Sequence, residues 1–537
     1  MTKETISDRF GEADEKRSSL LQRCRDYASL TIPAVLPPAG QSQDDELPAC
    51  WSNIGGEGME NMVGKVLTSL YPVGIPWFAI TPAAEVKAAV GSLTGYGTPL
   101  TADQYNEFAA MLYAWELVAA SKAEASNYRL AKRAETESLL ICGNGLTRMA
   151  RDYSLRYFRF DNWVCKRSGG GTLLWTITRE KKAPIELTPE DRSKAKIKSG
   201  DKDDVDLFTL CERVRTGDGD EDFAWRITQE VNEAILYDNE GSEEPVSPYN
   251  CVGYRLCPGE DYARGFIATR FPDLKSSNSL WQSLIFGMAN AAKMLWVVDT
   301  SEPYLRQSDL LKPNGAVTAG RVVQGVVQGA ACLQTNKNAD FGLAFQGAQA
   351  IEQRLGRSML METASMPKGE RVTAYAVGRI AQELDGALGG PYAHIADESQ
   401  KPYLARLLYQ LERDKIIAPL PAGTGKAMKI DVLTGSAALA KSFELDKLVG
   451  AIQLLAPIQG ALDRIDVQVL VDRIFQYRGI DTSGLIKTAE KVQAELQQKM
   501  MQAAMPEAGK QFVKTVGSVI EQRAAQQQAD LKQTGNA

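Results

Sequence analysis

The segment SSNSLWQSLIFGMANAAKMLWVV, residues 276–298, sets the architecture that we expect for this chain. Trp281, Leu284 and Met288 recur at the spacing of one helical face, and Phe286 adds apolar surface on another. A helix that is apolar nearly all round must be covered on more than one side. We therefore predict a helix over this segment, and neighbouring subunits are one source of its cover.

Helical patterns extend on both sides of this segment, which makes the predicted fold mainly helical. Apolar residues step at helical spacing over 12–30, 59–70, 102–141, 340–362 and 373–414, and most of the chain after 435 follows the same pattern. The sequence Gly389-Gly390-Pro391 interrupts the longest of these patterns and predicts a kink there. At about 1.5 Å per residue, that element would span roughly 60 Å, more than a compact domain needs.

Strand patterns interrupt the helices at several places, so the fold class is α+β. The segments LRYFRF at 155–160 and TLLWTIT at 172–178 are predicted as strands joined across Ser168-Gly169-Gly170-Gly171. Further β structure is expected near 206–215, 223–231, 321–329 and 427–435. The charged stretch 179–206 is interpreted as a solvated loop.

Composition limits the class of protein. A chain of 537 residues gives a prior of three or four domains, and 44% hydrophobic residues exclude wholesale disorder. With 61 Lys+Arg and 67 Asp+Glu the net charge is −6, which argues against a protein that wraps nucleic acid. The polar N-terminus and short apolar runs predict a soluble protein made in a cytoplasm. Eight cysteines without a C-x-x-C pair indicate free thiols in a reducing compartment.

The candidate motifs for catalysis or ligand binding fail on inspection. His394 is the single histidine, so two-histidine zinc sites and two-histidine acid–base schemes are excluded, and a structural or surface role is expected. AGTGKA at 422–427 lacks the first Gly and the Ser/Thr of a phosphate loop. GDGDEDF at 217–223 has Phe223 where a calcium loop needs Gly, so an acidic hairpin is predicted. We expect no catalytic activity, no cofactor and no metal.

Seven strings recur in an order and spacing that mark a known family, although each string alone is weak. They are LTIPAVLP at 30–37, GEGMENMVGKVLTSLYPVGIPWF at 56–78, LLICGNGL at 139–146, GEDYARGF at 259–266, GERVTAYAVGRIAQELDGALGG at 369–390, FELDKLVGAIQLLAP at 443–457 and YRGIDTSGLI at 477–486. In this order the chain resembles the portal protein, or head-to-tail connector, of short-tailed bacteriophages. The resemblance covers nearly the whole chain.

The resemblance implies a division of the chain into the named parts of a portal. It assigns the wing to 1–262 and 373–434, the two stem helices to 263–298 and 340–362, the clip to 299–339, a tunnel or valve loop to 363–372, and the crown with a C-terminal tail to 435–537. The implied fold is the portal fold, assembled as a cyclic ring around a central DNA channel.

The resemblance also implies the function and its partners. A homo-oligomer, usually of twelve subunits, would sit at one capsid vertex of the virion, pass viral double-stranded DNA without sequence specificity, and nucleate procapsid assembly. The implied partners are the large terminase subunit, the tail adaptor or gatekeeper protein, the major capsid and scaffolding proteins, and internal core proteins. Synthesis would take place in the host cytoplasm.

The net charge of the chain is consistent with a channel through which DNA passes without tight binding. Six net negative charges per chain, repeated twelve times, give about −72 for the ring, which repels phosphate over most of its surface. A few cations at the constriction would then grip DNA locally, and Lys368 and Arg371 in the candidate valve loop are the residues that we select. The competing interpretation makes them ordinary solvated charges of a loop.

Two other classes of protein remain as alternatives at this point. One is an internal virion scaffold or ejection protein without a central hole. The other is an enzyme of the same virus, a packaging ATPase or a nuclease, which predicts ATP turnover or metal binding. The failed phosphate-loop motif and the absence of an acidic cluster in the sequence argue against the enzyme.

Overall fold

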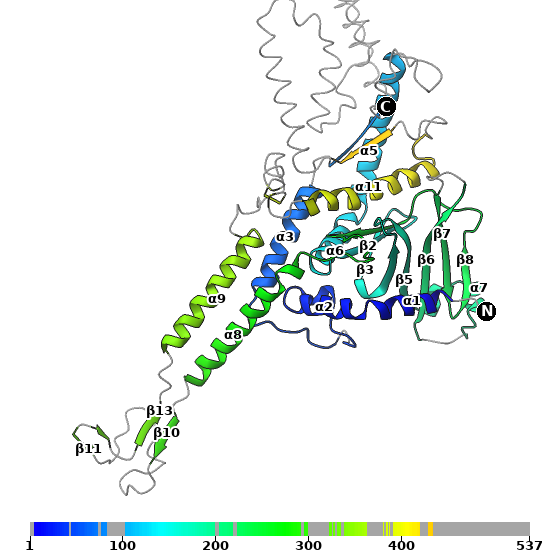
Figure 1. Cartoon of the computed structure of the whole chain (residues 1–537). Helices are drawn as coiled ribbons and strands as arrows, with labels where there is room; N and C mark the ends of the chain where they lie inside the picture. Colours follow the sequence, from blue (N-terminus) through cyan, green and yellow to red (C-terminus); the bar gives the residue numbers. More distant parts are fainter. Residues whose placement is uncertain are drawn as a thin grey trace, which may run out of the picture. The chain divides into compact units, whose positions relative to one another are not determined.

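The computed structural model describes residues 5–72, 77–82, 102–298, 338–361, 390–418 and 428–432 with short internal gaps, together with parts of 322–333 and 380–386. These residues all belong to one compact unit, Met1–Ser442. Their helices and sheets agree with the predicted mixed fold (Figure 1). None of the helices in the described ranges is long and apolar enough to cross a membrane.

The first helical region is two helices rather than one. We predicted a helix over 12–30, whereas α1 spans Ile6–Lys16 and α2 spans Ser18–Ser29. Arg17 stands at the break, where its buried guanidinium donates a hydrogen bond to the carbonyl of Phe160 at 2.8 Å. The contact of Arg17 with Phe160, which is far away in sequence, thus accounts for the break between α1 and α2. Helical periodicity does not reveal this break.

Three central helices form the scaffold of the unit. Helix α3, Ile54–Leu70, confirms the helix predicted over 59–70 and begins earlier. The region 102–141 divides into α5, Ala102–Ala125, and α6, Tyr128–Ile141. Asn127 lies between these two helices, and its side-chain amide exchanges two hydrogen bonds with the backbone of Leu155, at 2.7 and 3.0 Å. The break therefore docks the start of α6 on strand β3, Leu155–Phe158.

A five-stranded antiparallel sheet follows the order β4-β5-β6-β7-β8. Its strands are Trp163–Arg167, Leu173–Lys182, Val205–Arg215, Phe223–Val231 and Ala234–Asp238. A three-stranded sheet, β3-β2-β9, contains Leu155–Phe158, Asn144–Met149 and Tyr249–Gly253. The strands predicted near 206–215 and 223–231 are confirmed as the β6–β7 hairpin.

Two predictions about these sheets are wrong. The glycine turn at 168–171 joins β4 to β5, not β3 to β5, because β3 pairs with β2 in the other sheet. The stretch 179–206 is also not simply a solvated loop. Strand β5 runs on to Lys182, and α7, Pro189–Lys194, begins behind the N-cap Thr188. The end of β5 was missed because it is rich in charged residues, which we expected to be exposed. One of them, Glu180, is buried.

Helices α8, Phe271–Ala291, and α9, Asn338–Ser358, pack side by side (Figure 1). The helix predicted over 276–298 is wrong at its end, because Leu295–Val298 forms strand β10 and pairs with β13, Ala330–Leu333. Four consecutive residues rich in β-branched and aromatic side chains favour the strand. The β structure predicted at 321–329 is present as the small pair β11, Val322–Val323, and β12, Val326–Val327.

The last described helix, α11, spans Gly390–Arg413 and packs on β9. It confirms the part from Gly390 of the helix predicted over 373–414, whereas most of 373–389 lies outside the described residues, so the kink predicted at Gly389-Gly390-Pro391 stays a prediction. The strand predicted at 427–435 is confirmed as β14, Met428–Val432, which pairs antiparallel with β1, Phe78–Pro82. The helices expected after 435 lie outside the described residues.

Candidate functional site

The helix pair α8–α9 meets along a narrow apolar seam. Leu284 on α8 and Ala348 on α9 are buried, and the rings of Trp281 and Phe345 meet edge to face with centroids 5.7 Å apart. Gly287 permits the close approach, because a Cβ at this position would lie 2.4 Å from the Phe341 ring. The seam alone does not bury the remaining apolar side chains of these helices.

Polar contacts tie both helices to the loop before α3. One carboxylate oxygen of Glu352 on α9 accepts hydrogen bonds from the Trp281 indole at 2.6 Å and from the Ser52 hydroxyl at 2.7 Å. The side chain of Asn278 on α8 accepts a bond from the backbone of Trp51 at 2.8 Å. The bonds of Ser52 and Trp51 join the loop before α3 to both helices of the pair.

The C-terminal end of α9 is anchored on α3. The ammonium of Lys65, which is buried, donates to the carbonyl of Leu360 at 3.0 Å and pairs with Glu383 at 3.4 Å. Asn61 donates to the carbonyl of Met359 at 2.9 Å. The chain therefore leaves a fixed point at Leu360 just before the segment 363–372, the predicted valve loop.

Apolar side chains remain exposed on both members of the pair. Phe286 and Met288 on α8 keep about half of their surface exposed, at 51% and 52%, and Leu343 on α9 keeps 73%. The Trp51 ring lies against Phe286 with centroids 5.1 Å apart and is itself 40% exposed. We call Trp51, Ile285, Phe286, Met288, Leu343 and Phe345 the apolar stripe, a name for exposed apolar residues of this helix pair on more than one face, since Phe286 and Met288 are two positions apart on α8. Large apolar side chains left exposed in such number mark protein–protein contacts.

The residues selected from the sequence as the DNA grip are not among those described. Lys368 and Arg371 lie outside the described residues, and so does the segment 422–427. Arg215 pairs with Phe223 across β6 and β7, and residues 218–222 of the predicted acidic hairpin lie outside the described residues. Within the described ranges, His, Cys, Asp and Glu residues form no group that could hold a metal ion.

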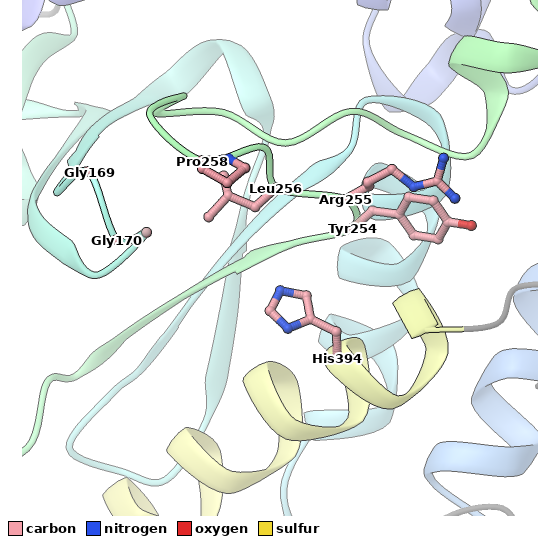
Figure 2. Close-up of a pocket in the computed structure, with 8 residues that line it drawn as sticks. Gly169, Gly170, Tyr254, Arg255, Leu256, Pro258 and His394 are labelled. Atoms are coloured by element: carbon pink, nitrogen blue, oxygen red, sulfur yellow. The ribbon is translucent and has the colours of Figure 1, made fainter.

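His394 lies on the first turns of α11 beside a pocket of about 420 Å³ (Figure 2). Opposite it are the glycine turn between β4 and β5 and the loop after β9. The lining residues are Gly169, Gly170, Gly171, Tyr254, Arg255, Leu256, Pro258 and His394. His394 pairs with Glu398 at 3.3 Å, and the other oxygen of Glu398 accepts the backbone N–H of Gly253 at 3.0 Å. These contacts fit the structural role that we expected.

Sequence reasoning missed the residues that build the anchor and the stripe. Lys65 interrupts the apolar pattern of α3, and a lysine among buried helix positions is a signal for an internal partner. Trp51 precedes α3 in a segment without helical or strand periodicity. The one signal in the sequence is a large aromatic residue in a segment that is otherwise mostly polar. Glu352 had no sequence signal.

Comparison with known proteins places the chain in a family. The model of the family described as "Bacteriophage head to tail connecting protein" matches residues 3–486. The chain belongs to this family, so the family predicted from the seven strings is confirmed.

Curated relatives named as portal proteins match this chain over most of their length. The portal protein of Enterobacteria phage T3 is 27% identical, with 90% of this chain and 89% of that protein covered. The portal protein of Escherichia phage T7 is also 27% identical over 90% of this chain, and that of Pseudomonas phage phiKMV is 25% identical over 92%. A solved neck of a gene transfer agent particle aligns with a TM-score of 0.32 at 11% identity over 74% of this chain and 85% of that one, too distant to establish the fold.

Proposed function

We propose that this chain is a portal subunit, which forms a ring at one capsid vertex through which viral double-stranded DNA enters and leaves. The observation that carries the proposal is the family match over residues 3–486, with portal proteins aligned along nearly their full length. The role is that of a passive conduit, an assembly nucleus and a docking platform. We propose no catalytic activity for it, and a location in the virion after synthesis in the host cytoplasm.

Helices α8 and α9 serve as the stem in this proposal. The apolar stripe supports the assignment, since Phe286, Met288 and Leu343 are exposed in the single chain and need a cover. The occupant that we propose is the neighbouring copy in a cyclic ring, where each subunit shelters the apolar side of the next. The segment 299–339 would be the clip that meets the large terminase subunit and then the tail adaptor.

The loop 363–372 serves as the valve, with Lys368 and Arg371 facing DNA. The anchor at Leu360 supports this assignment, because a loop that grips a moving polymer needs fixed ends. A net charge of −6 per chain favours loose passage elsewhere in the bore. The remaining segments would follow the family division, with 1–262 and 373–434 in the wing and 435–537 in the crown.

Electron microscopy of the purified chain in negative stain tests this proposal. We expect closed rings with a central hole. Rods or amorphous oligomers would instead favour an internal virion scaffold or ejection protein, and ATP turnover by the same sample would favour a packaging ATPase.

A double variant locates the contact between copies. Changing Phe286→Asp together with Met288→Asp places charges on the apolar stripe, so rings should give way to free subunits in mass photometry. Ile185→Asp is the matched control, because Ile185 is 84% exposed on a different surface beside α7. Rings that persist in the double variant would contradict the assignment of the stripe to the neighbouring copy.

A further inference from the structure

The loop that follows strand β9 carries three arginines around two aromatic rings. The backbone N–H of Arg264 donates to the carbonyl of Arg255 at 3.0 Å, so these two residues lie side by side across the loop. The guanidinium carbon of Arg270 lies 3.6 Å from the centre of the Phe266 ring. That ring in turn meets the Tyr254 ring edge to face, with centroids 6.4 Å apart. The three cations are therefore gathered around one short loop.

Two of these arginines have no carboxylate partner in the described part of the chain. Arg255 is exposed and forms no ion pair there, and Arg270 donates to three neutral oxygens at 3.1 to 3.3 Å. Burial lowers the pKa of Arg270, and the charge of Arg255 acts in the same direction. Arg264 pairs with Glu260 at 2.6 Å, and 63% of its side chain stays exposed. Like charges without an anion between them favour an anion from outside the chain.

The acidic residues beside this loop already have partners of their own. Asp261 pairs with Lys166 at 3.0 Å, and Glu398 on α11 pairs with His394 at 3.3 Å. Arg255 and Arg270 thus remain as uncompensated positive charges on a chain whose net charge is −6. A local excess of cations on an acidic protein attracts a negatively charged partner to that place.

The same loop forms one side of the pocket shown in Figure 2. Arg255, Leu256 and Pro258 line it from the loop, His394 lines it from α11, and the glycine turn 169–171 lies across from the loop. The volume of about 420 Å³ holds a large side chain, and only Arg255 and His394 among the lining residues can carry charge. An uncharged pocket beside exposed cations suits a protein segment better than a DNA duplex, which presents its phosphates outward.

We propose that the pocket and the three arginines form a docking surface for an acidic protein segment that carries one large apolar side chain. That side chain enters the pocket between Leu256 and the glycine turn, where Gly169 and Gly170 leave open space. Carboxylates on either side of it pair with Arg255 and Arg264, since a guanidinium binds a carboxylate through two parallel hydrogen bonds. The surface belongs to a single chain, so the proposal does not rest on the portal function.

Fluorescence anisotropy with the full-length protein tests the docking surface. The probe is a labelled synthetic nonapeptide of aspartates with one central phenylalanine, and we expect it to bind. Replacing the aspartates by asparagines, or the phenylalanine by serine, should each weaken binding about tenfold or more. A short DNA duplex is the comparison probe. Tighter binding of the duplex than of the acidic peptide would overturn the proposal, because the cations would then serve phosphate.

Two variants separate the cations from the pocket. Arg255→Glu with Arg264→Glu should lower the affinity for the acidic peptide about tenfold or more, because like charges then face each other. Gly170→Val should narrow the pocket and weaken the phenylalanine peptide while leaving the serine peptide unchanged. Arg151→Glu with Lys194→Glu is the matched control, because both residues are exposed cations elsewhere, and it should bind as the wild type does.

Two further results would overturn the proposal. The first is equal binding of the aspartate and asparagine peptides by the wild-type protein. The second is an equal loss of affinity in the control and in the Arg255 and Arg264 variant, which would show that general charge attraction decides binding. The peptide series on the wild-type protein decides the question even where a variant fails to fold.

Discussion

The ammonium nitrogen of Lys132 lies 2.7 Å from a carboxylate oxygen of Glu135, and both side chains are buried. The Ser399 hydroxyl from α11 bridges them, at 2.9 Å from each group. Thr147 on β2 donates to the second oxygen of Glu135 at 3.2 Å, and the Tyr71 hydroxyl meets Ser399 at 2.9 Å. The pair therefore joins α6 to α11, to a central strand and to the end of α3.

Removing one charge of the Lys132–Glu135 pair should destabilise the protein far more than removing both charges. Lys132→Met leaves the Glu135 carboxylate buried without its cation, which should lower the free energy of unfolding by about 3–5 kcal/mol. The double variant Lys132→Met with Glu135→Leu should recover a large part of that loss, because no charge stays unpaired. Urea unfolding followed by tryptophan fluorescence measures both. Equal losses in the single and double variants would show that the unpaired Glu135 carboxylate carries no extra penalty and would contradict this prediction.

Helix α1 is held at its start by a residue more than two hundred positions away. The carboxylate of Glu230 on β7 accepts the backbone N–H groups of Ile6 at 2.9 Å and Ser7 at 3.2 Å. A buried carboxylate at a helix N-terminus satisfies free N–H groups and complements the helix dipole.

Glu230→Ala should therefore loosen α1 and cost about 1–2 kcal/mol. Hydrogen exchange over residues 6–16 should quicken while exchange in β6 stays slow. Glu15→Ala, an exposed change on the same helix, is the control and should leave the exchange pattern unchanged. Unaltered protection of α1 in the Glu230 variant would mean that Thr5 and Asp8, which form its capping box, suffice.

Periodicity predicted the helices of this fold well and their boundaries poorly. The apolar stripe of α3 is complete enough to read directly, whereas α1 offers only two buried apolar residues, Ile6 and Phe10. The divisions at Arg17 and Asn127 depend on hydrogen bonds to distant backbone groups, at Phe160 and Leu155. Contacts of that range leave no local pattern.

Some residues of the candidate sites could be predicted from local sequence, and others could not. The apolar excess of α8 pointed correctly to side chains that the chain alone does not bury, including Phe286 and Met288. The anchor of Lys65 on Leu360 requires the tertiary fold, since it joins residues that are far apart in sequence. Lys368 and Arg371 remain a prediction from the resemblance.

The packing of α8 on α9 depends on the absence of a side chain at Gly287. Gly287→Ala would drive a methyl group to 2.4 Å from the Phe341 ring, so the helices must separate or the ring must turn. We expect a loss of about 1–3 kcal/mol in unfolding free energy by thermal denaturation. Adding Phe341→Leu should restore part of it by making room.

Gly342 provides the matched control on the same helix pair. A Cβ at this α9 position would have open space among the described atoms, so Gly342→Ala should be neutral or add up to about 1 kcal/mol through helix propensity. If Gly287→Ala proves equally harmless, the close approach of the two helices in the structure is wrong.

The valve assignment makes the last prediction. Lys368→Ala with Arg371→Ala removes two cations per subunit just beyond the anchor at Leu360, and about twenty-four from a ring of twelve. Ring assembly should be unchanged, because neither residue belongs to the apolar stripe. Packaging or retention of DNA should fall, and its dependence on salt should become shallower, since fewer phosphates are neutralised.

A control variant for this experiment removes two positive charges per subunit from a different part of the chain. Arg151 and Lys194 are exposed cations in the sheet region, and changing both to Ala lowers the net charge equally. A packaging assay with quantified genome content per particle compares the two double variants at several salt concentrations. If both lose packaging to the same degree, bulk charge decides DNA passage. If the Lys368 and Arg371 variant packages and retains a full genome, the grip on DNA lies elsewhere in the channel.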